Sequence, residues 1–276
     1  MMIEASMSFE LRDISVRHAS TDPRDLNHAL NEVDLSIAQG EQVALIGSSG
    51  AGKTTLLHTL ACAHPPLFGR LSVFGTEPWA MQPARRHALR ARLFLAPQMP
   101  PLPPRQRVVT AVLAGRLPQW SFRQAIASLF SPADPDAAYD ALARFSLQDK
   151  LYTRVDRLSG GERQRCAMAR LLLSRADALL VDEPLSALDP ALAQQTLGVL
   201  QQEAASRSAT LVCSLHQVDL ALKNFPRIVG LRDGCILFDA AREEITGAMI
   251  DELYSNERRH SIDDYLPSPH PLIDAE

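Results

Sequence analysis

The stretch QVALIGSSGAGKTTLLHTLACA, residues 42–63, decides the fold class of this 276-residue chain. The apolar run from Gln42 to Ile46 predicts a short strand, a glycine-rich loop follows it, and the next ten residues predict a helix. A strand, a glycine loop and a helix in this order form the first half of a parallel α/β unit. We therefore expect an α/β fold.

The loop GSSGAGKT, Gly47 to Thr54, has the spacing of a phosphate-binding loop, so we expect the α/β core to be of the P-loop NTPase type. Its glycines let several backbone N–H groups point at phosphate oxygens, and the helix N-terminus adds about +0.5 charge. Lys53 is expected to reach the β- and γ-phosphates, and Thr54 to offer its hydroxyl to Mg²⁺. The expected cofactors are ATP and Mg²⁺, and the expected binding set is Gly47, Ser48, Ser49, Gly50, Ala51, Gly52, Lys53, Thr54 and Thr55.

An acidic pair ends the apolar strand predicted in ALLVDEP, Ala178 to Pro184. Asp182 is placed to hold Mg²⁺, directly or through water. Glu183 is one residue further along and can polarise the attacking water, and a positioned general base contributes about 10²–10⁴-fold to a rate. We expect Asp182 to be a metal ligand and Glu183 to be the catalytic base.

Two further polar residues follow predicted core elements. His216 comes directly after the strand predicted from Thr210 to Leu215, so we expect it to contact the γ-phosphate. Gln98 stands at the entry to a proline-rich stretch, where it could touch Mg²⁺ or the attacking water. Both are therefore candidate catalytic residues, and Gln98 is also a candidate metal ligand.

The octapeptide LSGGERQR, Leu158 to Arg165, predicts a second phosphate-binding helix terminus. Ser159 and Glu162 have the spacing of a helix capping box. A cap needs no paired glycines, but Gly160 and Gly161 at a helix start would allow an anion to approach bare backbone N–H groups. One γ-phosphate cannot readily meet both helix termini within one chain. A head-to-tail pair of chains, with the loop of one facing Ser159 of the other, would solve this problem.

The organisation predicted along the chain is one ATP-binding domain with an insertion. Strands expected from Ser8 to Val16 and from Val33 to Ile37 open it, in an N-terminal antiparallel arrangement. We expect the domain to span residues 8–252, with an α/β core at 8–96 and 166–245 and an α-helical subdomain at 97–165. The hairpin signal Asp233-Gly234 lies near the end of the core. Residues 253–276 are polar and predict a C-terminal tail.

Composition argues against several classes of protein. The formal net charge of −4 offers no basic face, so no nucleic-acid partner is expected. The four cysteines have no C-x-x-C spacing, which favours small buried side chains in a reducing cytoplasm over disulfides or zinc. No signal peptide is seen, and no apolar segment reaches the ~20 residues needed to cross a bilayer. Any role at a membrane would therefore require a partner protein.

Together, these motifs resemble the ATP-binding subunit of ABC transporters, over roughly Phe9 to Glu252. The resemblance rests on the glycine loop, Gln98, LSGGE, VDEP, the segment SALDP at residues 186–190, and His216. It implies two ATP molecules sandwiched in a homodimer, with Asp189 exchanging contacts between the two sites. It also implies an integral membrane permease, indirectly a solute-binding protein, and a peripheral location on the cytoplasmic face of the inner membrane.

A finer resemblance, to the phosphonate-import ATPases, rests on three segments. These are VLAGRLPQWSF, SLHQVDLAL and RIVGLRDGCILFD, which begin at Val112, Ser214 and Arg227. The sequence differs from the family's pattern in two places. The family stacks adenine on an aromatic side chain after the first strand, where this chain has His18. Prolines follow Gln98, in a loop that in the family leads toward the permease.

Two alternatives stay open at this stage. The chain could serve an ABC transporter for another solute, because the solute pocket belongs to the permease and its binding protein. It could also be a soluble ABC-type ATPase that acts on nucleic acid or ribosomes. Such proteins usually carry tandem ATPase cores or long coiled-coil insertions, and this chain has one core and a short insertion.

Overall fold

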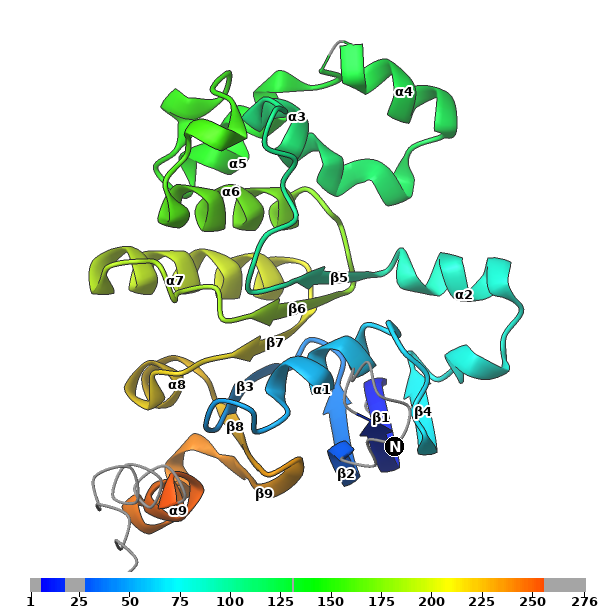
Figure 1. The fold of residues 1–276 in the computed structure, drawn as a ribbon, viewed down its shortest axis with the longest axis vertical. Helices are drawn as coiled ribbons and strands as arrows, with labels where there is room; N and C mark the ends of the chain where they lie inside the picture. The colour runs from blue at the N-terminus through cyan, green and yellow to red at the C-terminus, as the bar shows by residue number, and fades with distance from the viewer. Residues whose placement is uncertain (1–5, 18–27, 131, 256–276) are drawn as a thin grey trace, which may run out of the picture.

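A six-stranded sheet forms the centre of the molecule in the computed structural model, which describes residues 6–17, 28–130 and 132–255 (Figure 1). In spatial order its strands are β5 (Leu93–Ala96), β6 (Ala178–Asp182), β7 (Thr210–Ser214), β3 (Gln42–Ile46), β8 (Arg227–Arg232) and β9 (Cys235–Ala241). The first five strands run parallel to one another, and β9 pairs antiparallel with β8. The predicted α/β fold class is confirmed.

The two faces of this sheet pack against different layers because side chains alternate along a strand. Val43 and Leu45 of β3 join a core cluster with helix α1 (Lys53–Leu60) and a second, antiparallel sheet. Ala44 and Ile46 join another cluster with the helices of the opposite face. The antiparallel sheet has the order β2-β1-β4, with β1 at Met7–Arg17, β2 at His28–Ala38 and β4 at Phe68–Val73.

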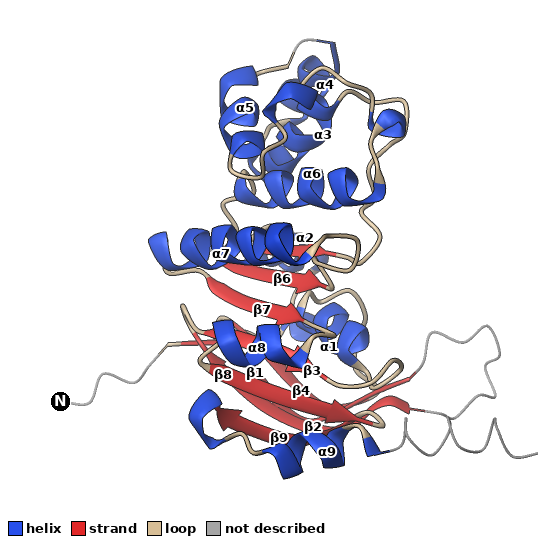
Figure 2. Cartoon of the chain, turned by 90° about the vertical axis from the view of Figure 1, so that its left-hand side faces the viewer, coloured by secondary structure: helices blue, strands red, loops and turns tan. Residues whose placement is uncertain are grey.

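Helices cover the remaining face of the central sheet and form a separate layer at one end of the molecule (Figure 2). The remaining α-helices are α2 (Pro83–Arg90), α3 (Val108–Leu113), α4 (Phe122–Phe130), α5 (Pro135–Ala143), α6 (Gly160–Leu172), α7 (Pro190–Ser206), α8 (Val218–Asn224) and α9 (Gly247–Leu253). Short 3₁₀ helices lie at Pro78–Ala80, Ala114–Gln119, Gln148–Lys150, Val155–Arg157 and Arg242–Glu244.

The helical layer consists of α3, α4 and α5 above α6 (Figure 2). The boundary expected between residues 165 and 166 falls inside α6, so this expectation needs correction. Helix α6 is continuous because its buried side chains serve both parts of the fold. Cys166, Met168 and Leu172 belong to one hydrophobic cluster that includes residues of α3, α5, α7 and the central strands. One rigid helix therefore joins the helical layer to the core.

The C-terminal part of the core ends slightly later than expected. The β8–β9 hairpin turns at Asp233 and Gly234, both with positive φ (51° and 79°), as a two-residue hairpin turn of the Asp-Gly type requires. Leu253, placed in the polar tail by the sequence, closes α9 and is 1% exposed in the core. Residues 256–276 of the expected tail lie outside the described residues.

No helix within the described residues is long and apolar enough to span a bilayer.

Candidate active site

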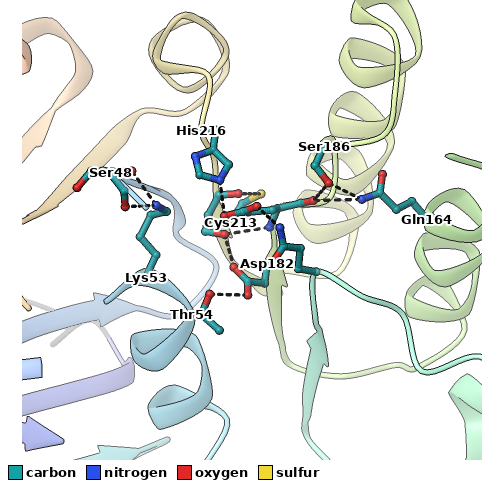
Figure 3. A network of polar contacts seen from close by, with 12 residues as sticks. Ser48, Lys53, Thr54, Gln164, Asp182, Ser186, Cys213 and His216 are labelled. Carbon is teal, nitrogen blue, oxygen red and sulfur yellow. Dashed lines mark hydrogen bonds and ion pairs between the residues drawn. The ribbon is translucent and has the colours of Figure 1, made fainter. Parts of the chain in front are cut away.

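The carboxyl ends of four neighbouring parallel strands meet at one edge of the central sheet. Because the spatial order is β5-β6-β7-β3, this edge gathers Gln98, the Asp182–Glu183 pair, His216 and the glycine loop, although they are far apart in sequence. Figure 3 shows Thr54, Asp182 and His216 on the elements that meet there. Ligands of open α/β sheets bind at such an edge. The strand order therefore explains why these sequence motifs form one site.

The glycine loop connects β3 to α1 and holds Lys53 inside the site. Gly47 has a φ of 150°, and a Cβ there would lie 2.2 Å from the carbonyl oxygen of Leu231, so only glycine fits. Lys53 is 4% exposed, and its Nζ donates to the carbonyl oxygens of Gly47 at 2.7 Å and Ser48 at 2.9 Å. The ammonium thus lies within the curve of the loop, where phosphate oxygens would meet it.

Asp182, the last residue of β6, receives two hydroxyl groups. The Oγ1 of Thr54 donates to its Oδ2 at 2.9 Å, and the Oγ of Ser214 donates to its Oδ1 at 2.6 Å. The carboxylate is 2% exposed and is held from both sides. Thr54 and Asp182 thereby offer two hard oxygen donors close together at the start of α1. This donor set suits Mg²⁺, which binds through one or two protein oxygens and completes its shell with water and phosphate.

Glu183 turns its carboxylate away from the strand and into the cleft. Its φ of 48° lies in the left-handed region, which costs a non-glycine residue about 1–3 kcal/mol. Its Oε2 accepts a hydrogen bond from Gln98 Nε2 at 2.6 Å, and its Oε1 lies 2.6 Å from His216 Nε2. The backbone N–H of Glu183 donates to Ser214 Oγ at 2.9 Å. The three residues Gln98, Glu183 and His216, each singled out in the sequence, are in direct contact.

The cleft between the glycine loop and this carboxylate is lined by Ser49, Gly50, Ala51, Gly52, Lys53, Thr54, Thr55, Gln98, Glu183 and His216. Ser159, Gly160, Gly161 and Glu162 are not among these lining residues. Within the described residues, the structure therefore assembles most of the predicted site and leaves the LSGGE segment outside it.

The LSGGE segment forms the predicted capping box at the start of α6. Ser159 Oγ accepts from the N–H of Glu162 at 3.2 Å, and Glu162 Oε2 accepts from the N–H of Ser159 at 2.8 Å. Ser159 and Gly160 are exposed. A Cβ on Gly161 would lie 2.8 Å from the carbonyl oxygen of Ala187, so this glycine permits close packing on the loop after β6. Both glycines are expected from the sequence to give an anion access to the helix terminus, and Gly161 in addition packs closely on Ala187.

The loop after β6 ends at Asp189, which is exposed and caps α7. Its Oδ1 accepts from the N–H groups of Ala191 and Leu192, each at 3.0 Å. His18, the candidate for stacking on adenine, lies outside the described residues.

Two contributors to the site were missed in the sequence. Ser214 binds both Asp182 and the backbone of Glu183, and Gln164 of α6 binds the backbone carbonyl of Glu183 at 3.4 Å. Ser214 ends β7, one strand beside β6, so its place at the strand's carboxyl end was a usable signal. Gln164 carried no comparable signal, because its role depends on how α6 packs.

The cysteines divide into two groups. Cys62, Cys166 and Cys213 are buried, whereas Cys235 on β9 is exposed, which corrects the expectation that all four are buried. Burial raises the pKa of the Cys62 thiol to about 11 and that of Cys166 to about 12, and it also raises the pKa of Cys213. The buried thiols are therefore protonated at neutral pH.

Comparisons with known proteins agree on one family. A model of the family described as ABC transporter matches residues 30–186. The chain is 54% identical to the phosphonates import ATP-binding protein PhnC of Polaromonas sp., over 90% of each chain. It is 53% identical to the phosphonates import ATP-binding protein PhnC 2 of Pseudomonas aeruginosa, over 91% of this chain and 92% of that protein.

Solved structures show the same fold at lower identity. A bacterial ABC transporter cassette, solved as a dimer, has a TM-score of 0.73 at 23% identity and covers 86% of this chain and 100% of its own. A cassette from Clostridium perfringens, part of the cbiONQ complex, has a TM-score of 0.71 at 19% identity and covers 94% of this chain and 99% of its own.

Proposed function

This chain belongs to the ABC transporter family of ATP-binding proteins, and we propose that it is the ATP-hydrolysing subunit of an importer for phosphonates. The observation that carries the ATPase proposal is the Glu183 carboxylate, held between Gln98 and His216 at the edge of the phosphate cleft. The phosphonate assignment rests on the names of relatives that share about half of the sequence over nine-tenths of its length.

ATP binds with its β- and γ-phosphates in the glycine loop. The N–H groups at the start of α1 donate to the phosphate oxygens, and Lys53 exchanges the carbonyl oxygens of Gly47 and Ser48 for phosphate. Thr54 and Asp182 would hold Mg²⁺, and Gln98, which binds Glu183, is a further candidate ligand. The bound ion would neutralise charge on the β- and γ-phosphates.

Hydrolysis begins with a water molecule placed beside Glu183. The carboxylate accepts a proton from the water as the water oxygen bonds to the γ-phosphorus. The bond from phosphorus to the oxygen bridging the β- and γ-phosphates breaks, which releases ADP and phosphate. Gln98 and His216 fix the two carboxylate oxygens, so the remaining lone pairs face the water. His216 also stands where it can donate to the γ-phosphate.

Two chains complete each site in a head-to-tail dimer. Ser159 and Gly160 are exposed at the N-terminus of α6, outside the cleft of their own chain. In the dimer, the N–H of Gly160 and the Ser159 hydroxyl contact the γ-phosphate bound to the loop of the partner. Asp189, exposed at the end of the neighbouring loop, lies at the same interface.

The dimer acts on a permease from the cytoplasmic face of the inner membrane, where the chain is held as a peripheral subunit. Formation and hydrolysis of the ATP sandwich change the shape presented to the permease, which receives its phosphonate from a solute-binding protein. Co-purification from solubilised membranes tests this part: a phosphonate permease should be recovered, and recovery of a permease for an unrelated solute would refute the cargo assignment.

The substitution Glu183→Gln tests the ATPase proposal. Loss of the base should reduce steady hydrolysis at least 10²-fold and trap a dimer loaded with ATP, since binding groups are unchanged. Phosphate release and size-exclusion chromatography with ATP measure both effects. Undiminished hydrolysis in this variant would exclude Glu183 as the base.

Ser159→Arg tests the dimer separately. A bulky cation at the exposed helix terminus should block the sandwich while ATP binding to the glycine loop persists. Equilibrium binding of ATP and the rate of hydrolysis would be compared for this variant. Normal hydrolysis would contradict the composite site.

A further inference from the structure

Gln164 joins the start of α6 to the segment that carries Glu183. It lies five residues after Ser159 on α6, is 5% exposed, and belongs to none of the groups assigned to nucleotide chemistry above. Figure 3 shows its side chain pointing from α6 toward Ser186. Its amide also donates to the backbone carbonyl of Glu183. A buried amide with both ends engaged has a defined structural role.

We define the linker loop as residues 184–189. Both ends of the Gln164 amide bind this loop, and the nitrogen end also binds Glu183, the residue before it. Nε2 donates to Ser186 Oγ at 2.8 Å and to the carbonyl oxygen of Glu183 at 3.4 Å, and Oε1 accepts from the N–H of Ala187 at 3.1 Å. Gly161, one turn earlier on α6, packs against Ala187 closely enough to exclude a Cβ. The first turns of α6 and the linker loop therefore form one unit.

The backbone of Glu183 is consequently fixed from two directions. Its N–H is bound by Ser214 of β7, and its carbonyl oxygen is bound by Gln164 of α6. Between these two groups the residue keeps a left-handed φ of 48°, the conformation that directs its carboxylate into the cleft. Displacement of α6 would act on this carbonyl directly.

In the proposed dimer, the start of α6 is connected to two different nucleotides. Ser159 contacts the ATP bound by the partner, whereas Glu183 acts on the ATP bound by its own chain. We propose that Gln164 is a positioning residue that transmits the position of the α6 N-terminus to the Glu183 carboxylate of the same chain, and so couples the two composite sites. This inference rests on the proposed head-to-tail dimer.

Substitution in both chains of the dimer gives the first test. Gln164→Met keeps the side-chain volume and removes all three hydrogen bonds, so kcat for ATP should fall roughly tenfold or more. KM should stay within about twofold, because no group that binds ATP is changed. Gln164→Glu keeps an acceptor for Ala187 and should recover part of kcat.

A matched control separates this effect from general damage to the fold. Gln201 on α7 is a partly buried glutamine that also binds a side chain and a backbone carbonyl, those of Gln42 and Asn224. Gln201→Met should leave kcat and KM unchanged. A Gln164→Met variant that changes KM and kcat alike, or neither, would overturn the proposal.

Mixed dimers decide whether Gln164 acts on its own chain. Both dimers carry Glu183→Gln in one chain, so a single base remains, and hydrolysis of prebound ATP is followed as a single turnover. In the cis dimer, Gln164→Met is in the chain that keeps Glu183. In the trans dimer, it is in the chain with Glu183→Gln. A dimer with Glu183→Gln alone is the reference.

The cis dimer should hydrolyse ATP roughly tenfold more slowly than the reference, and the trans dimer should match the reference. A slow trans dimer with a normal cis dimer would overturn the inference, because Gln164 would then act through Ser159. Equal rates in all three dimers would also overturn it. Failure of the proposed function is distinguishable, since the wild-type dimer would then hydrolyse no ATP.

Discussion

The imidazole Nε2 of His216 lies 2.6 Å from Oε1 of Glu183, on the opposite side of the carboxylate from Gln98. The two partners come from different loops, one after β7 and one after β5. The carboxylate is therefore oriented by groups from two different loops. The side chain of His216 is 45% exposed and that of Glu183 only 10%, so the histidine is the more solvent-exposed of the two.

His216→Ala should lower kcat roughly 10²-fold while ATP binding changes little, because one carboxylate orienter and one phosphate donor are lost together. Stability should stay within about 0.5 kcal/mol, since the ring is half-exposed and surface pairs contribute little. Steady-state hydrolysis and urea unfolding measure the two effects. His87→Ala, at an exposed position on α2, is the control. A kcat within twofold of wild type would contradict this prediction.

Asp182→Asn should abolish the response of hydrolysis to Mg²⁺ at concentrations that saturate the wild type. An amide binds Mg²⁺ less well than a carboxylate, but its oxygen can still accept from Thr54 or Ser214, so the fold should persist. A Mg²⁺ titration after treatment with a chelator gives the readout. Asp177→Asn, whose carboxylate pairs with Arg92 just before β6, should titrate like the wild type.

Much of the fold and site could be predicted because the motifs are local. The strand and loop around Lys53, the Asp182–Glu183 strand end and the Asp233-Gly234 turn depend on residues adjacent in sequence. Their meeting at one edge depends on strand order, which no local pattern encodes. Helix α7 was missed although Asp189 and Pro190 are typical of a helix start, and buried residues recur along it at helical spacing.

The contacts that sequence reasoning did not foresee join residues that are distant along the chain. Gln164 is important because α6 packs on the linker loop, and Gly161 is a glycine because Ala187 approaches it. A sequence pattern shows which residue types are present but does not show which backbone will lie against them.

One thiol per chain should react with a chromogenic disulfide reagent at pH 7.5. Cys235 is exposed, whereas Cys62 and Cys166 are buried with pKa values raised to about 11 and 12, so their reactive thiolate is scarce at this pH. Four thiols should react after unfolding in urea. The substitution Cys235→Ser should remove the fast phase, and a fast phase that survives it would contradict the burial of the other three.

The burial of these thiols also predicts how the free energy of unfolding changes at alkaline pH. The unfolded chain loses its thiol protons near pH 9, but the folded chain keeps those of Cys62 and Cys166 until about pH 11 and 12. Raised pKa values in the folded state therefore contribute stability below pH 9 that is lost as the pH rises toward 12. Cys62→Ala should weaken this decline in the free energy of unfolding above pH 9, whereas Cys235→Ala should leave its slope unchanged.

A single added methyl group should lower the stability of the fold at Gly161 but not at Gly160. Neither has positive φ, so alanine is acceptable to the backbone at both positions, and only the neighbours differ. A Cβ on Gly161 would lie 2.8 Å from the oxygen of Ala187, whereas one on Gly160 would have its nearest neighbour at 3.9 Å. Gly161→Ala should therefore destabilise the fold by about 1–3 kcal/mol through overpacking.

Gly160→Ala should leave the urea midpoint and the m-value close to those of the wild type, because its methyl group would make only an ordinary contact with Ala187, at 3.9 Å. The same methyl group would stand at the exposed start of α6, where the proposed dimer brings the partner's γ-phosphate. ATP hydrolysis should therefore fall in Gly160→Ala without loss of stability. A fully active Gly160→Ala variant would show that the close approach of an anion does not require this glycine. Equal stability of the two variants would show that the contact between α6 and Ala187 does not restrict the side chain at position 161.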